Sequence, residues 1–243
     1  MNNYLNVGID GATCWPTEET CISFGGHNLV LKPATKDTEQ SVHINLIGIA
    51  NVEALTLINR FLSILAWCDD QGIENLYGWS GNPNPTSVPK RLRLTGSSIA
   101  FPFYREPEED SKAKLALALF REGLTVNSTS FKFLSFFKVL NIFWKDKFKS
   151  GQNDLIEGIR GYLNKLTDEL AINRLEKITH QEQDVAKYLY ESGRCAIAHA
   201  YSEPIVDPDD VQQLRRLSED IHLIKNIAEL LIENELHISR TIY

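Results

Sequence analysis

The chain has 243 residues, a formal net charge of −7 and 43% hydrophobic residues, so it is long enough to bury a sizeable core and too apolar to be disordered. The acidic balance excludes a protein whose whole surface binds nucleic acid, although a local basic patch is compatible with it. No stretch reaches the 18 apolar residues of a membrane span, and the N-terminal MNNYLNVGID lacks the basic and apolar regions of a secretory signal. We therefore expect a cytoplasmic protein with no membrane partner.

The first hundred residues have the sequence pattern of a β-rich domain. Short extended segments are separated by Gly25-Gly26, Pro33 and polar loops, and one nearly continuous apolar helix is expected from Val52 to about Cys68. The proline-rich and acidic stretch around Pro107 is typical of a linker. The expected strands are Tyr4–Ile9, Thr20–Phe24, Leu29–Lys32, Ser41–Ile47, Leu76–Trp79 and Arg91–Leu94.

After Asp110 the pattern becomes helical and remains so to the end of the chain. Thr179-His180-Gln181-Glu182 has the form of a capping box and predicts the start of a helix that runs toward His199–Tyr201. Asp207-Pro208 predicts the start of the final long helix, with an acidic N-cap and proline at the first helical position. The fold class expected is therefore α+β, with a β-rich domain over 1–108 and an all-α bundle over 109–243.

The positive charge of the chain is concentrated in one region. Residues 111–150 carry eight basic and two acidic side chains, a net charge of +6, whereas the segments on either side are acidic. Lys145, Lys147 and Lys149 alternate with aromatic residues, a pattern that can hold phosphates and stack bases. These three lysines are the candidate RNA-binding residues. The alternative is an amphipathic helix with aromatic residues in the core and lysines in solvent.

Four cysteines and six histidines give no metal-ligand spacing, and no phosphate-binding, dinucleotide-binding or nucleophile-elbow motif is present. We expect reduced thiols, no metal and no cofactor.

One motif carries the functional hypothesis. Arg194 is followed after four residues by His199 and then by Tyr201, the form R-x4-H-x-Y. By chance this form is expected only about 0.01 times in such a chain. It resembles the signature of HEPN domains (higher eukaryotes and prokaryotes nucleotide-binding), and its place late in a helical region agrees with them. The resemblance covers roughly residues 110–243.

The resemblance implies a metal-independent endoribonuclease, in which the ribose 2′-hydroxyl attacks the adjacent phosphate. Proton transfer would fall to His199, because histidine is the side chain that ordinarily titrates near neutral pH, and Arg194 would supply fixed positive charge at the phosphate. Tyr201 would position the phosphate or donate a proton. Five residues of α-helix leave Arg194 and His199 about 140° apart, so either the helix departs from α geometry or two copies share one cleft. The family uses a homodimer, here through the C-terminal helices. RNA is the implied substrate, in a toxin–antitoxin or antiviral defence system with a regulatory partner protein.

Three other interpretations remain open. Catalytic HEPN members usually carry a polar residue after the arginine, where this chain has Cys195, and a non-catalytic module that binds RNA, nucleotide or a partner protein would fit that difference. Arg194 would be purely structural if it paired with Glu191 or Asp184. Finally, the N-terminal half, with Asn59-Arg60-Phe61-Leu62-Ser63, is similar to methylamine utilisation proteins of the MauJ type, which implies an accessory protein of amine metabolism.

Overall fold

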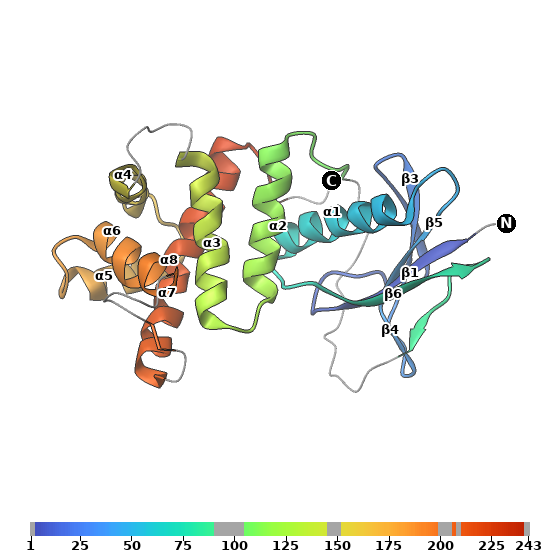
Figure 1. The fold of residues 1–243 in the computed structure, drawn as a ribbon, viewed down its shortest axis with the longest axis horizontal. Helices are drawn as coiled ribbons and strands as arrows, with labels where there is room; N and C mark the ends of the chain where they lie inside the picture. The colour runs from blue at the N-terminus through green and yellow to red at the C-terminus, as the bar shows by residue number, and fades with distance from the viewer. Residues whose placement is uncertain (1–2, 90–104, 145–151, 199–205, 208–209, 241–243) are drawn as a thin grey trace. The chain divides into compact units, whose positions relative to one another are not determined.

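A computed structural model describes residues 3–89, 105–144, 152–198, 206–207 and 210–240. The chain forms two compact units, one of residues 1–125 with 239–243 and the other of residues 126–238. An N-terminal β-sheet region is followed by a C-terminal helical region, as the α+β class predicts (Figure 1). The expected domain boundary lay between 108 and 109, whereas the compact units divide after Thr125, because the helix α2 (Ser111–Thr125) packs with the helix α1 (Asn51–Asp69) of the first unit.

The first unit contains a five-stranded antiparallel sheet in the order β2-β3-β5-β1-β6. A short ladder between β4 and β7 lies beside it. The strands are β1 (Tyr4–Asp10), β2 (Thr20–Phe24), β3 (His27–Lys32), β4 (Thr38–Glu39), β5 (Ser41–Asn45), β6 (Glu74–Asn82) and β7 (Val88–Pro89). Each expected strand among the described residues is present, and the strand expected at Arg91–Leu94 lies outside them.

The register gives the sheet one apolar face and one partly polar face. Leu5 stands opposite Ile44 and Val7 opposite Val42, and all four side chains are buried. The helix α1 (Asn51–Asp69) packs on this apolar face, where Phe61 contacts the rings of Trp15 and Phe24 at centroid distances of 6.2 and 5.7 Å. The extent of α1 agrees with the helix expected from Val52 to Cys68.

The chain returns to the first unit after α8. The main-chain carbonyl of Ser239 accepts hydrogen bonds from the Trp67 indole at 2.9 Å and from Arg105 at 2.7 Å. The Arg240 guanidinium lies 4.3 Å from the centre of the Trp67 ring.

The second unit is helical, and α3 packs along α8 at its centre (Figure 1). Gly158 of α4 has no room for a side chain, because a Cβ atom there would lie 2.4 Å from the Trp144 ring. Among the described residues of the chain, no helix is both long and apolar enough to cross a membrane. The elements are α3 (Thr129–Trp144), α4 (Gln152–Leu163), α5 (Glu169–Thr179), α6 (Val185–Tyr188), η1 (Leu189–Cys195), α7 (Ala196–Ala198) and α8 (Val211–Glu235).

Two predicted helix starts were wrong. Thr179 ends α5 instead of capping the next helix, because its hydroxyl donates to the Leu175 carbonyl one turn back at 2.8 Å. The N-cap of α6 is Asp184, whose side chain accepts from the Lys187 amide. Similarly, α8 starts three residues beyond the predicted cap: Asp210 accepts from the amide of Gln212 at 2.8 Å.

Candidate functional site

The motif that contains Arg194 begins in a helix that changes its hydrogen-bond pattern. The four residues of α6 are followed by the π-helical segment η1, in which the Ala196 N–H donates to the carbonyl of Glu191, five residues back. Such segments are rare and occur frequently at functional sites. Arg194 and Cys195 are the last two residues of η1. The first residue of the motif, Arg194, therefore lies in a segment that departs from α geometry.

A glycine lets η1 lie close to α3. A Cβ atom on Gly193 would fall 2.3 Å from Cζ of Phe133, a distance that real Cβ contacts do not reach. Phe133 is buried and stacks on Phe137, which in turn contacts the Tyr190 ring at 6.2 Å. Gly193 thus places the π-helical segment directly against the aromatic core of the second unit.

A buried charged network supports the same segment from α8. Asp220 is 1% exposed. Its Oδ1 accepts from Nε of Arg174 at 2.8 Å, and its Oδ2 accepts from the hydroxyl of Tyr188 at 2.8 Å. Arg216 donates to the Tyr188 hydroxyl at 3.0 Å and to the carbonyl of Ser192 at 2.8 Å. Burial raises the pKa of Asp220, and the charge and hydrogen bonds of Arg174 oppose that rise. The network therefore connects α5 and α8 to Tyr188 and Ser192, which precede Arg194 in the chain.

The environment of Arg194 is aromatic and sulfur-containing. Its guanidinium lies 5.7 Å from the centre of the Tyr190 ring, and Nη1 lies 3.7 Å from the Cys195 sulfur. Burial raises the pKa of Tyr190, Cys195 adds to the rise, and the positive charge of Arg194 opposes it. Arg194 is half-buried and is available as a fixed cation.

The carboxylates expected as structural partners of Arg194 are paired with other cations. Glu191 lies 3.9 Å from the Lys187 ammonium, and Asp184 accepts from Arg160 at 2.6 Å. Partial burial raises the pKa of Asp184, but the Lys187 amide and the Arg160 guanidinium outweigh it and hold that pKa below its usual value. In the described part of the chain no ion pair joins Arg194 to either carboxylate.

The other predicted site residues are not placed. His199, Tyr201, Lys145, Lys147 and Lys149 lie outside the described residues, so their roles stay predictions. Within the described ranges, no group of three or more histidine, cysteine, aspartate or glutamate side chains could hold a metal ion.

Sequence reasoning missed the supporting network. Asp220 was the available signal, because a carboxylate that stands between Leu217 and Ile224 lies on the apolar face of a long amphipathic helix. Buried carboxylates are almost always paired with cations, and the residue four positions before Asp220 is Arg216.

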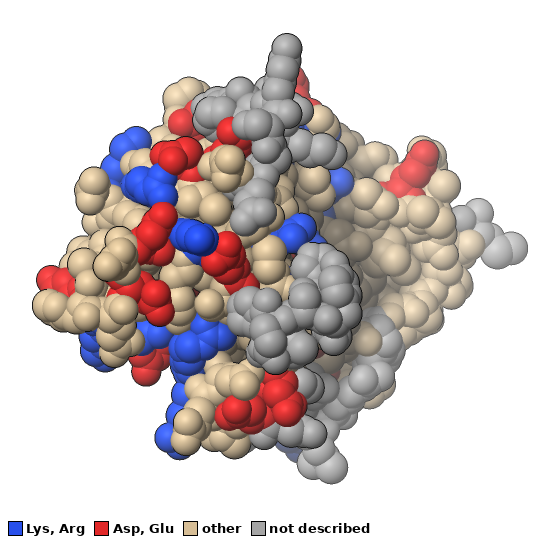
Figure 2. All heavy atoms as spheres, turned by 60° about the vertical axis from the view of Figure 1, so that its left-hand side comes forward, with Lys and Arg blue, Asp and Glu red and all other residues tan. Residues whose placement is uncertain are grey.

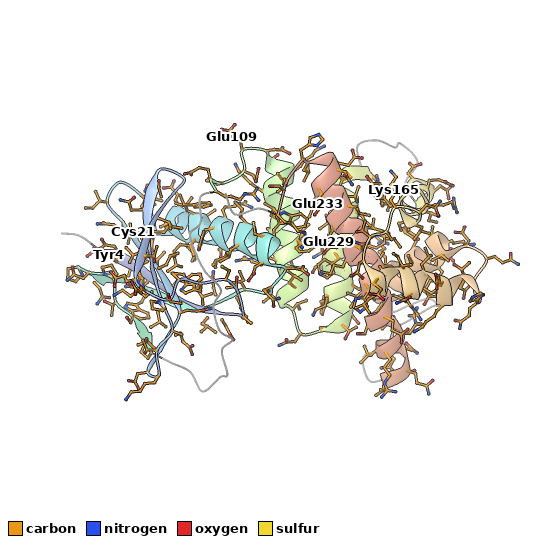
Figure 3. The ribbon with its side chains drawn as sticks, turned by 180° about the vertical axis from the view of Figure 1, so that it is seen from behind. Tyr4, Cys21, Glu109, Lys165, Glu229 and Glu233 are labelled. Atoms are coloured by element: carbon orange, nitrogen blue, oxygen red, sulfur yellow. The ribbon has the colours of Figure 1, made fainter. Side chains whose placement is uncertain are left out.

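The surface of the helical unit carries both signs of charge side by side (Figure 2). On α8, Lys225 lies 3.2 Å from Glu229, which lies one turn before Glu233 (Figure 3). Tyr162 of α4 donates to Glu235 at 3.0 Å, and burial raises its pKa to about 12. This acidic end of α8 is unsuited to phosphate. The π-helical segment is the better candidate for an anionic ligand, because Arg194 has no ion pair with Glu191 or Asp184 among the described residues.

Residues 116–233 match the family model described as "Methylamine utilization protein MauJ". The match covers a little less than half of the chain and includes η1 and the Asp220 network. It supports the predicted similarity to MauJ proteins, but over the helical region and not over the N-terminal residues expected to carry it. No curated protein and no solved structure shows significant similarity to the chain. The resemblance to HEPN domains rests on the R-x4-H-x-Y motif alone.

Proposed function

We propose that this chain is an accessory protein of amine utilisation, and that its helical unit acts by binding an anionic ligand or partner at the π-helical segment. The observation that carries the proposal is the match to the methylamine utilisation family, because it includes this segment and the buried network behind it. Arg194 supplies fixed positive charge there. Cys195, at the position where catalytic HEPN members usually carry a polar residue, favours binding over cleavage.

Gene disruption in the source organism tests this proposal. The disrupted strain should fail to grow, or grow slowly, with methylamine as the only nitrogen source, and should grow normally with ammonium. Wild-type protein and an Arg215→Ala variant, which removes an exposed arginine of α8, should restore growth, whereas Arg194→Ala should not, although it accumulates to the same level. Normal growth of the disrupted strain on methylamine would overturn the proposal.

A second candidate function is metal-independent RNA cleavage by Arg194, His199 and Tyr201. The specific observation in its favour is η1, because Arg194 belongs to a π-helical segment, and such segments occur frequently at functional sites. Arg194 would neutralise the phosphate, His199 would transfer the proton, and Tyr201 would orient the substrate. Lys145, Lys147 and Lys149 would hold the RNA, and a homodimer would complete the cleft in a defence or toxin–antitoxin setting.

The purified protein should then cut single-stranded RNA in the presence of EDTA and leave 2′,3′-cyclic phosphate ends. His199→Ala should lower the rate by about 10²–10⁴-fold, and Arg194→Ala by a comparable factor. Arg215→Ala is the matched control, since Arg215 is exposed and stands one residue from the network. If the protein binds RNA but never cuts it, the binding function replaces the nuclease function. If the His199→Ala variant unfolds, His199 has a structural role.

A further inference from the structure

We draw no further inference here: the strongest candidate, the open groove between α1 and β6 of the first unit, is lined by apolar side chains such as Val52, Leu55 and Trp79, and nothing in the described part of the structure shows what covers it.

Discussion

Arg216 of α8 and Ser192 of the π-helical segment are joined by a hydrogen bond of 2.8 Å from the guanidinium Nη2 to the main-chain carbonyl. In an α-helix that carbonyl would accept from the Ala196 N–H, but here the Ala196 N–H is directed to the carbonyls of Glu191 and Gly193. Arg216 therefore supplies a donor at the point where the helical pattern changes. Its Nη1 also holds the Tyr188 hydroxyl, at the residue directly before η1.

Arg216→Met should loosen the π-helical segment. The Ser192 carbonyl loses a charged donor, which typically stabilises by about 1.5–3 kcal/mol, so the free energy of unfolding should fall by about that amount. Amide hydrogen exchange should accelerate in Leu189–Cys195 more than in the rest of the unit. Arg215→Met, on the exposed side of α8, should change the free energy of unfolding by less than about 0.5 kcal/mol. Unchanged exchange in η1 would show that Arg216 does not hold the segment.

Gly193→Ala should be among the most damaging small substitutions in the helical unit. The new Cβ would meet the buried Phe133 ring at 2.3 Å, and overpacking of this kind costs about 1–3 kcal/mol. Gly161→Ala in α4 is the matched control, because its Cβ would meet nothing within 4 Å. That change should stabilise by up to about 1 kcal/mol through helix propensity.

Urea denaturation of both glycine variants measures the difference. A second substitution, Phe133→Leu, should recover part of the stability in the Gly193→Ala background, since the side chain that blocks Cβ becomes smaller. Equal effects of the two glycine changes would mean that η1 can move away from α3 at little cost.

Residues 239–243 should stabilise the first unit although they are distant from it in sequence. Without them the buried Trp67 indole loses its acceptor, the Ser239 carbonyl, and an unsatisfied buried donor costs about 1–3 kcal/mol. Their deletion should lower the melting temperature, whereas deletion of 241–243 alone keeps both Ser239 and Arg240 and should have a smaller effect. Calorimetry compares the melting temperatures of the two truncated chains, and equal values would contradict a role for Ser239.

The sheet could be predicted from the sequence to within a few residues because its signals are local. Ser41–Asn45 alternates polar and apolar residues, and Gly25-Gly26 forms the tight turn between β2 and β3. The π-helical segment could not be predicted, because it depends on a contact between Gly193 and Phe133, sixty positions apart. The capping box at Thr179 failed for a similar reason. Thr179 belongs to the last turn of α5, and Asp184, held by Arg160 from another helix, becomes the cap of the next helix.

The candidate site could likewise be predicted only in part from the sequence. Arg194 was identified from spacing alone, and the structure places it in a helical segment of unusual geometry. The residues that support Arg194 were not identified from the sequence, because Arg174, Tyr188 and Asp220 come from three helices and have no common sequence pattern.

His43 lies on the partly polar face of the sheet and is fully buried. Its Nδ1 lies 2.8 Å from Oδ1 of Asn6, its neighbour on β1, and its Nε2 lies 3.0 Å from the Ser41 hydroxyl. Burial lowers the pKa of His43 to about 4, and the charge of Lys32 adds to the effect. The imidazole is therefore neutral in the folded protein throughout the physiological range.

The buried neutral His43 makes the stability of the protein depend on pH. In the unfolded chain its pKa is about 6.5, so between about pH 6.5 and about 4 the unfolded state binds the proton and the folded state does not. The contribution of His43 to the free energy of unfolding is therefore complete above pH 6.5 and is lost as pH falls from about 6.5 to about 4. The loss amounts to roughly 3 kcal/mol at 1.36 kcal/mol per pKa unit. Urea denaturation between pH 4 and 8 should show this slope in wild type and in His27→Gln, and a flatter one in His43→Gln, whose amide keeps hydrogen-bonding capacity without titrating. The same slope in all three proteins would contradict the assignment of the titration to His43.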